Sequence, residues 1–241
     1  MRLTRGGRFY TLVSKDMNVA ASESGAESIL CITETEQVGV GCVKVTAGTT
    51  CFFVRDAYLR RVTIAHITAG NTLVDEDATD VLDAALAFAA EKEAERYLAR
   101  CEHSRAGLER KLLRKGMNRQ TVALALDYLE ARQYLSDARF AECWLRAHAY
   151  EKPQGRARLQ SELRARGVSR QVADVALDAF FAEYSEHALC VRAVEKSLRA
   201  GRCGDKLVRH LQQSGFRYQQ IQRALEAVSA CGADDRFGGG D

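Results

Sequence analysis

The chain has 241 residues, of which 46% are hydrophobic, and Pro153 is its one proline. This hydrophobic share excludes a chain that is disordered throughout, and the scarcity of proline favours a mainly helical protein. The net charge of +3 hides an asymmetry, because residues 1–90 carry a balance of −3 whereas residues 91–230 carry +8. The basic region suits an acidic or polyanionic partner, although an arginine-rich solvated surface would have the same charge.

The eight cysteines and the N-terminus bear on the cellular compartment. No two cysteines form a C-x-x-C pair, so zinc-ribbon and thioredoxin-like motifs are missing, and we expect reduced, mostly buried thiols. No apolar signal segment follows the basic N-terminus, and no run of 18 apolar residues occurs. These features predict a soluble, cytoplasmic protein that does not enter a membrane.

The first two segments differ in composition. Residues 1–27 are small and polar, and we expect a poorly ordered N-terminal arm. Residues 28–79 contain β-branched and aromatic runs at 29–32, 38–45 and 50–54, and Ala47-Gly48-Thr49 separates the last two as a hairpin turn would. The pattern predicts a small β-hairpin or antiparallel sheet of two or three strands, with a helix covering one face.

An acidic run stands at the boundary between the strand pattern and the helical pattern. Its members are Asp75, Glu76, Asp77, Asp80 and Asp83. A calcium-binding EF-hand loop starting at Asp75 would need a glycine at its sixth position and a glutamate at its twelfth, and both are missing. We therefore interpret the run as carboxylates at a helix N-terminus, where they complement the helix dipole.

An internal repeat dominates the remainder of the chain. Each copy contains two leucines four residues apart, then a glycine, and then an apolar i, i+3, i+4, i+7 pattern typical of an amphipathic helix. The leucine pairs start at Leu108, Leu159 and Leu207, and the glycines are Gly116, Gly167 and Gly215. A glycine here suits the left-handed residue that ends a helix. Asn118 and Ser169 are good N-caps for the following helix, whereas the third copy has Arg217.

A further amphipathic stretch precedes each copy, so that each repeat has three helices. We predict helical repeats at residues 80–136, 137–185 and 186–230, followed by a flexible tail at 231–241. Three-helix units of about 50 residues bury little surface alone. Tandem copies that share buried surface would form an elongated, slightly curved body.

The chemistry-bearing motifs of common enzymes are missing. The sequence contains no phosphate-binding loop, no zinc-protease helix motif, no nucleophile elbow and no dinucleotide-binding fingerprint. Its five histidines are scattered, and the pair Cys101 and His103 lacks companion ligands. We therefore predict a protein that is not an enzyme and that holds no cofactor and no metal.

Surface charge is the remaining candidate for function. Arg110 and Arg114 are four residues apart, as are Lys111 and Lys115, so each pair lies along one stripe of a helix. Such stripes can contact phosphates or an acidic protein groove, and the alternative is the solvated face that every helical repeat needs. The candidate contact residues are Arg105, Arg110, Lys111, Arg114, Lys115, Lys152, Arg156, Arg158, Arg164, Arg166 and Arg170.

Five motifs follow one another in a characteristic order. They are Ala94-Glu-Arg-Tyr-Leu98, Ser104 before Leu108-x3-Leu112-x2-Lys115-Gly116, Tyr134-Leu-Ser-Asp137-x2-Phe140-Ala141-Glu142, Lys152-Pro-x-Gly155 and Glu162-Leu163-x2-Arg166-Gly167. In this order the chain closely resembles the bacterial RecX family over residues 80–229, most specifically over 134–167. The strand segment at 28–74 resembles the N-terminal region of many members more weakly.

The resemblance implies three tandem three-helix repeats and a role as a modulator, usually an inhibitor, of the RecA recombinase. Family members are thought to bind the RecA–DNA filament and to suppress its ATPase and strand-exchange activities. The implied partners are the RecA filament and single-stranded DNA, the latter directly or through RecA, in DNA repair, homologous recombination and the SOS response. Nothing in the repeat demands a dimer, so we expect a monomer. The alternative is a helical-repeat nucleic-acid-binding protein that acts independently of RecA.

Overall fold

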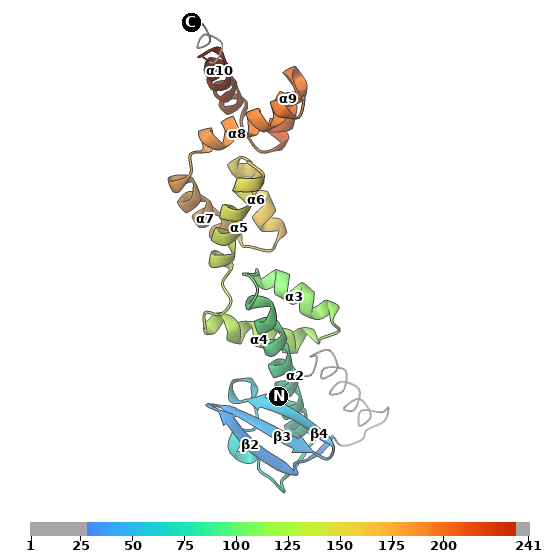
Figure 1. The fold of residues 1–241 in the computed structure, drawn as a ribbon. Coiled ribbons are helices and arrows are strands. Elements are labelled where there is room, and N and C mark those ends of the chain that lie inside the picture. The colour runs from blue at the N-terminus through green and yellow to red at the C-terminus, as the bar shows by residue number, and fades with distance from the viewer. Residues whose placement is uncertain (1–27, 235–241) are drawn as a thin grey trace, which may run out of the picture. The chain divides into compact units, whose positions relative to one another are not determined.

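The computed structural model describes residues 28–234. The predicted N-terminal arm and residues 235–241 of the predicted tail lie outside the described residues. The chain divides into two compact units, one containing residues 28–101 and 108–135 and the other containing 102–107 and the residues from 136 onward. Strands occupy the N-terminal part and helices the rest, as Figure 1 shows, so the predicted mainly helical class with a small antiparallel sheet is confirmed.

Five short strands form two antiparallel sheets within the described residues. Strands β2 (Glu34–Gly39), β3 (Cys42–Ala47) and β4 (Thr50–Arg55) pair in that order, while β1 (Ile29–Cys31) pairs with β5 (Thr72–Val74). The three-stranded sheet agrees with the predicted sheet of two or three strands, whereas the separate sheet of β1 and β5 was not predicted.

The predicted single run at 38–45 was also wrong, because a turn at Val40 and Gly41 divides it between β2 and β3. Gly41 has a φ of +64°, a conformation that glycine adopts readily. Strand β2 is charged and largely exposed, so it lacks the apolar alternation by which a strand is recognised in a sequence.

The predicted hairpin between β3 and β4 is confirmed, with Gly48 at a φ of +58° in its two-residue turn. Val43 and Val45 of β3 and Phe52 and Val54 of β4 are buried. They pack against the apolar face of helix α2 (Asp75–Leu98), which covers the sheet. The expected covering helix is therefore α2.

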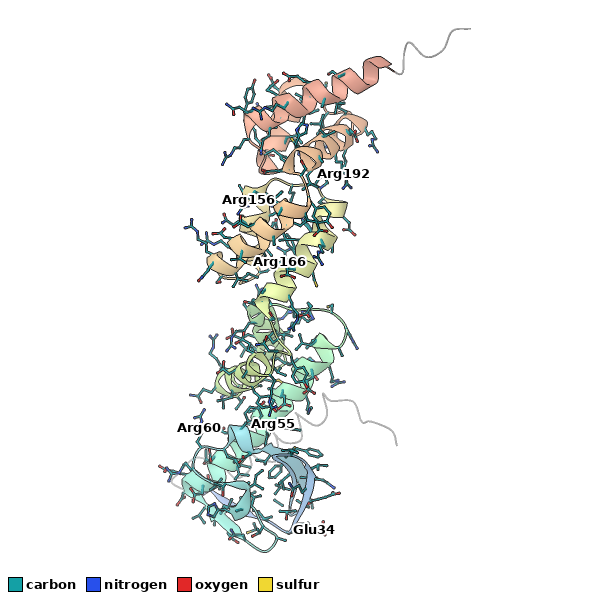
Figure 2. All side chains as sticks on the ribbon, turned by 90° about the vertical axis from the view of Figure 1, so that its left-hand side faces the viewer. Glu34, Arg55, Arg60, Arg156, Arg166 and Arg192 are labelled. Atoms are coloured by element: carbon teal, nitrogen blue, oxygen red, sulfur yellow. The ribbon has the colours of Figure 1, made fainter. Side chains whose placement is uncertain are left out.

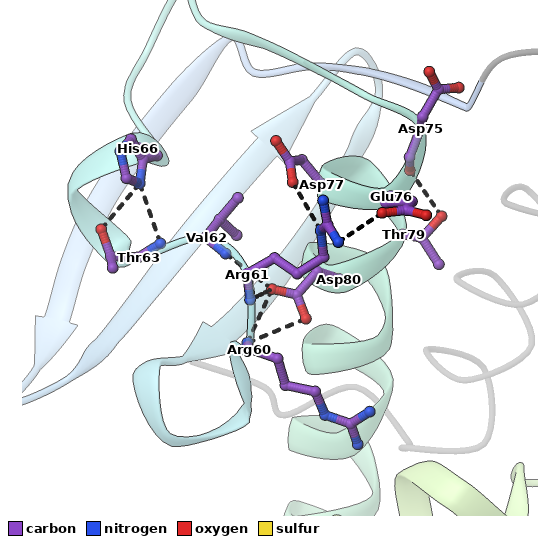
Figure 3. A network of polar contacts seen from close by, with 10 residues as sticks. All are labelled: Arg60, Arg61, Val62, Thr63, His66, Asp75, Glu76, Asp77, Thr79 and Asp80. Carbon is purple, nitrogen blue, oxygen red and sulfur yellow. Dashed lines mark hydrogen bonds and ion pairs between the residues drawn. The ribbon is translucent and has the colours of Figure 1, made fainter.

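The acidic run lies in the first turns of α2, where the carboxylates of Glu76, Asp77 and Asp80 bind the loop that precedes the helix. Asp80 is buried, and its carboxylate accepts hydrogen bonds from the backbone N–H groups of Arg60, Arg61 and Val62 at 2.8–3.2 Å, as drawn in Figure 3. The Arg61 side chain pairs with Glu76 at 2.6 Å. These carboxylates therefore stabilise the folded loop, and no group of side chains suited to a metal ion occurs within residues 28–234.

A buried ion pair ties the sheet to α2 in the first unit. The Glu91 carboxylate accepts hydrogen bonds from the Arg55 guanidinium at 2.6 and 2.8 Å and from the Tyr58 hydroxyl at 2.7 Å. Burial alone would raise the pKa of Glu91, but these two donors outweigh it and lower that pKa below its usual value. Burial and the Glu91 carboxylate raise the pKa of Tyr58, so its hydroxyl remains a donor.

Eight further helices follow α2 in the described residues. They are α3 (Arg105–Arg114), α4 (Arg119–Ala131), α5 (Asp137–Glu151), α6 (Arg156–Ala165), α7 (Arg170–Glu183), α8 (Glu186–Arg199), α9 (Gly204–Gln213) and α10 (Tyr218–Asp234). Each sequence copy thus corresponds to three helices. Because α10 continues to residue 234, the predicted tail at 231–241 begins inside a helix.

The three repeat glycines occupy equivalent turns. Gly116, Gly167 and Gly215 have φ values of +82°, +89° and +90°. In each copy the N–H of the following residue donates to the carbonyl of the second leucine of the pair, at 3.2–3.3 Å. This is the Schellman arrangement that satisfies free carbonyls at a helix end. All six leucines of the pairs are at most 2% exposed, so the predicted core face is confirmed.

Within the second unit, a hydrogen bond to a repeat turn occurs twice, with donors 51 residues apart. The Ser104 hydroxyl donates to the carbonyl of Arg166 at 2.7 Å, and the Gly155 N–H donates to the carbonyl of Ser214 at 2.9 Å. In each case the acceptor immediately precedes a repeat glycine. The second and third copies also share one buried core, which runs from Ala141 to Ala224.

The cysteine prediction was wrong in one respect. Of the seven cysteines whose side chains the structure describes, Cys190 alone is buried, and Cys31, Cys101, Cys143 and Cys203 are exposed. The thiols are free. Leucine and alanine fill most of the helical core positions, so most cysteines lie outside the cores. Between residues 28 and 234, every helix is too short or too polar to span a lipid bilayer.

Candidate functional site

The predicted arginines of the second copy lie on and around α6, but acids from α7 reach several of them. Arg156 and Arg166, labelled in Figure 2, lie at the two ends of α6. The Arg156 guanidinium pairs with Asp178 at 2.6 Å, and Arg170 lies 3.7 Å from Asp174. The row of cations is therefore partly neutralised by residues that follow it in the chain.

Glu162 holds two further candidates. Its carboxylate pairs with Arg158 at 2.8 Å and with Arg166 at 2.7 Å. The hydrogen bond from Arg166 lowers the pKa of Glu162, so this carboxylate stays charged. The Arg166 guanidinium also stacks on Trp144, with 4.5 Å between its central carbon and the ring centroid. Arg166 is thus a packed residue of the α5–α6 contact.

On α3, the lysine stripe also has structural partners. Lys115 forms an ion pair with Glu93 of α2, which raises the pKa of the lysine. The ammonium of Lys111 lies 4.7 Å from the centroid of the Tyr97 ring. This stripe contacts α2, although Lys115 is exposed, as are Arg110 and Arg114. Arg105 contributes its backbone N–H to the Asp137 carboxylate at 2.8 Å.

Three predicted cations remain exposed without an acidic partner in residues 28–234. They are Arg114, Lys152 and Arg164. Lys152 is the C-cap of α5, and its backbone N–H donates to the His148 carbonyl at 2.9 Å. It therefore stands at the entrance to the loop that joins α5 to α6.

A basic cleft of about 300 Å³ opens at this loop, entirely within the second unit. The loop, the C-terminal part of α8 and the C-terminal part of α9 form its walls. The lining residues are Lys152, Pro153, Gln154, Ala193, Lys196, Ser197, Arg202, His210, Leu211 and Ser214. No aspartate or glutamate is among these lining residues, so every ionisable group that faces this cleft is a base.

Local hydrogen bonds position the cations of the cleft. The Lys196 ammonium donates one hydrogen bond to the Glu151 carbonyl at 2.8 Å, which leaves two N–H groups for other acceptors. Arg202 follows Gly201, which has a φ of +75°, and its N–H donates to the Ser197 carbonyl at 3.0 Å. A Schellman turn thus directs the chain at Arg202.

A second hollow of about 440 Å³ continues the cleft. It shares Gln154, His210 and Ser214 with the first and adds Arg158 and Gln213. Of the residues predicted from the sequence, Lys152 and Arg158 line these hollows, whereas Lys196, Arg202 and His210 were missed. The sequence did contain a signal for these cations. Lys196 and His210 lie in the last turns of the amphipathic helices α8 and α9, and Arg202 follows the end of α8.

Sequence models of two known protein domains match parts of this chain. The first three-helix domain of RecX matches residues 90–135, and the second three-helix domain of RecX matches residues 136–177. The chain is 39% identical over 164 residues to regulatory protein RecX of Treponema pallidum (strain Nichols), an alignment that covers 68% of this chain and 99% of that protein.

The chain belongs to the RecX family. Regulatory protein RecX of Pelodictyon phaeoclathratiforme (strain DSM 5477 / BU-1) is 36% identical over 139 residues, which cover 55% of this chain and 84% of the relative. The chain is also similar in fold to two solved structures. A crystal structure of regulatory protein RecX has a TM-score of 0.63 at 19% identity and covers 83% of this chain and 99% of that chain. RecX from Lactobacillus salivarius has a TM-score of 0.51 at 18% identity, with coverages of 60% and 97%.

The two matched RecX domains meet between residues 135 and 136. The first RecX domain includes the end of α2 with α3 and α4, and the second includes α5, α6 and the first half of α7. The loop with Lys152 and Gly155 therefore lies inside the second RecX domain. The remaining walls of the basic cleft come from α8 and α9, after residue 177.

Proposed function

We propose that this chain is a non-enzymatic inhibitor of RecA, which binds the RecA–DNA filament and suppresses its ATPase and strand-exchange activities. Membership of the RecX family carries this proposal, because relatives of the chain are named regulatory protein RecX. In this role the protein acts in the cytoplasm as a monomer, without a cofactor, in DNA repair, homologous recombination and the SOS response.

The distribution of charge supports a filament partner. A RecA filament on DNA presents phosphates and protein surface together, and cations steer association with such a polyanion. The exposed Arg114 and Arg164 and the cleft around Lys152 offer cations for this contact. The other predicted basic residues contribute a positive field around these cations and do not contact the filament directly.

A titration of RecA ATPase activity tests the proposal. The full chain is added to RecA, single-stranded DNA and ATP at moderate salt, and phosphate release is followed. We expect hydrolysis to fall at ratios of chain to RecA of one or below, with no ATPase activity in the chain itself. Unchanged hydrolysis across the whole titration would refute inhibition of RecA.

Charge reversal locates the contact surface. We expect Arg114→Glu combined with Arg164→Glu to weaken inhibition severalfold, since neither side chain forms an ion pair in residues 28–234 and folding is left intact. The control is Lys206→Glu with Arg209→Glu, which changes the charge equally at exposed positions of α9. Equal inhibition by both variants and the unmodified chain would remove Arg114 and Arg164 from the contact surface.

The basic cleft also favours a second function, in which the chain binds nucleic acid independently of RecA. Anisotropy of a labelled oligonucleotide with the chain alone distinguishes the two. Tight, salt-dependent binding with no effect on RecA ATPase activity would support the second function. Inhibition of RecA by a chain that binds DNA weakly supports the first.

A further inference from the structure

The basic cleft in the second unit has the composition of an anion site. Its ionisable lining residues are Lys152, Lys196, Arg202 and His210, and Arg158, which pairs with Glu162 at 2.8 Å, lines the adjoining hollow. These residues are up to 58 positions apart in the chain, and the fold brings them around one opening. A concentration of like charge costs free energy unless a counter-charge binds there.

Helix ends offer a simpler explanation for some of these cations. Lys196 and His210 lie in the last turns of α8 and α9, where positive side chains complement the helix dipole. The C-terminal ends of α5, α8 and α9 contribute roughly half a negative charge each. Lys152, Lys196 and Arg202 carry three full positive charges, so they exceed the dipoles by more than one charge. These three side chains are exposed, so their surplus charge is available to attract another anion.

The uncharged lining groups suit phosphate oxygens. Ser197 has a hydroxyl group and Gln154 an amide, both of which can donate hydrogen bonds, whereas the Ser214 hydroxyl already donates to the His210 carbonyl at 2.9 Å. Lysine is a common phosphate ligand. Apart from the His210 imidazole, the lining contains no aromatic ring on which a base could stack. The cleft is therefore suited to a nucleic-acid backbone rather than to a base.

The continuation of the cleft favours a linear polyanion. Gln154, His210 and Ser214 line both hollows, so the path from Arg202 to Arg158 is continuous. A strand with one charge on every unit can place successive phosphates along such a path. An acidic protein segment is less well matched, because carboxylate pairs are best met by paired arginine forks and lysines predominate at the first hollow.

We propose that this cleft binds backbone phosphates of single-stranded DNA, with Lys196 and Arg202 as direct contacts and Lys152 at the entrance. The proposal for this cleft rests on the proposed function in one respect, namely that the bound strand is the single-stranded DNA of the RecA filament. The DNA contact then belongs to the second unit, at the boundary of the second and third helical copies.

The test compares two variants of the full chain that lose equal charge. Lys196→Gln with Arg202→Gln removes both direct contacts, and Arg209→Gln with Arg223→Gln removes two exposed cations of the third copy outside the cleft. Binding to a labelled oligothymidylate is measured by anisotropy at several salt concentrations, and circular dichroism checks the fold. Polyglutamate of equal charge serves as a competitor.

Each lost phosphate contact lowers the slope of log K against log salt by about 0.7, which is roughly fivefold in affinity at 0.1 M salt. We therefore expect Lys196→Gln with Arg202→Gln to weaken DNA binding by about 25-fold and to lower the slope by about 1.4, with little change in the control. Equal losses in the two variants, or a folded cleft variant that binds like the unmodified chain, would overturn the proposal. Stronger binding of polyglutamate than of DNA at the cleft would also overturn it.

RecA ATPase titrations with the same variants separate the two proposals. If the unmodified chain leaves RecA unaffected but binds DNA through the cleft, the proposed function fails and the cleft proposal stands. If the chain inhibits RecA and the cleft variant binds DNA normally, the cleft proposal fails and the proposed function stands.

Discussion

Gly116 and Gly167 adopt nearly the same backbone conformation in different surroundings. Both have φ values between +80° and +90°, but a Cβ at Gly116 would meet no atom within 4 Å, whereas one at Gly167 would lie 2.3 Å from the Cβ of Ala106. The two positions therefore separate backbone strain from a steric clash. Both substitutions to alanine incur the strain, and only one displaces a neighbour.

We expect Gly116→Ala to lower the free energy of unfolding by about 1–2 kcal/mol through left-handed strain alone. Gly167→Ala adds overpacking, which costs a further 1–3 kcal/mol or so. Urea unfolding followed by circular dichroism, with hydrogen exchange to locate the weakened helices, measures the difference. Equal losses for the two variants would show that the turn at Gly167 can move away from Ala106.

The stability of the first unit depends on pH through Glu91. Its pKa is lowered in the folded chain, so the ion pair with Arg55 stabilises the fold above the unfolded pKa of about 4.3 and is lost as the pH falls through the folded value. Glu91→Gln leaves the Arg55 cation without its counter-charge. The side chain of Glu91 is 1% exposed, so water cannot replace the lost partner.

We expect Glu91→Gln to destabilise the sheet by about 3 kcal/mol or more at neutral pH, and the deficit to shrink on acidification. Hydrogen exchange of residues 42–55, measured on the full chain at several pH values, follows this region. Lys44→Gln is the control, because the ion pair between Lys44 and Glu36 is exposed. A deficit that stays constant as the pH falls well below the unfolded pKa of about 4.3 would contradict the assignment.

At the scale of elements, helix starts differ between the three copies. Asn118 and Ser169 cap α4 and α7 with their side chains, which accept hydrogen bonds from Gln120 and Val172. Arg217 stands at the same position before α10 and has no such acceptor. Its backbone N–H donates instead to the Gln220 side chain at 2.8 Å, which is half of a capping box.

Arg217→Ser should therefore stabilise the third copy by about 0.5–1 kcal/mol, because serine would complete the box. The reciprocal change, Ser169→Ala, should cost about 1 kcal/mol at α7. Thermal unfolding of each variant measures the sign of the change. A loss of stability in Arg217→Ser would mean that the arginine side chain contributes more to this turn than the cap.

At the scale of the whole molecule, the thiols report how evenly the chain is packed. Burial raises the pKa of Cys190 to about 11, whereas Cys203 in the same copy is exposed. Since the thiolate is the reactive form, we expect Cys190 to react more than tenfold more slowly than Cys203 at neutral pH. Variants that retain one of these cysteines allow the rates to be compared. In urea the two cysteines should react at equal rates. Equal reaction rates under native conditions as well would indicate that the third copy opens readily.

Local pattern predicted the elements far better than it predicted the partners of their side chains. The recurring Leu-x3-Leu and glycine spacing determines which helix face is buried and where each helix ends, and all three turns agree with it. Strand β2 was missed because an exposed, charged strand has no apolar alternation. Its pairing depends on a turn at Gly41 and on neighbouring strands.

Of the contact residues predicted from the sequence, Lys152 and Arg158 line the two basic hollows. The basic balance of residues 91–230 indicates cations on the helical copies. Which of them are available depends on acids that arrive from other helices, such as Asp178 beside Arg156 and Glu93 beside Lys115. Charge counting along the chain cannot show this, because ion pairs form between residues more than 20 positions apart.

The sequence alone determined the helical class, the three copies, the glycine turns and the family, because these depend on periodicity and on residues close together in the chain. The tertiary structure alone decided which arginines are neutralised, that Glu91 and Asp80 anchor the strand segment, and that Lys196, Arg202 and His210 join Lys152 around one cleft. The physical reason is that Coulomb and hydrogen-bond energies depend on distance in space, and distance is set only when the helices pack.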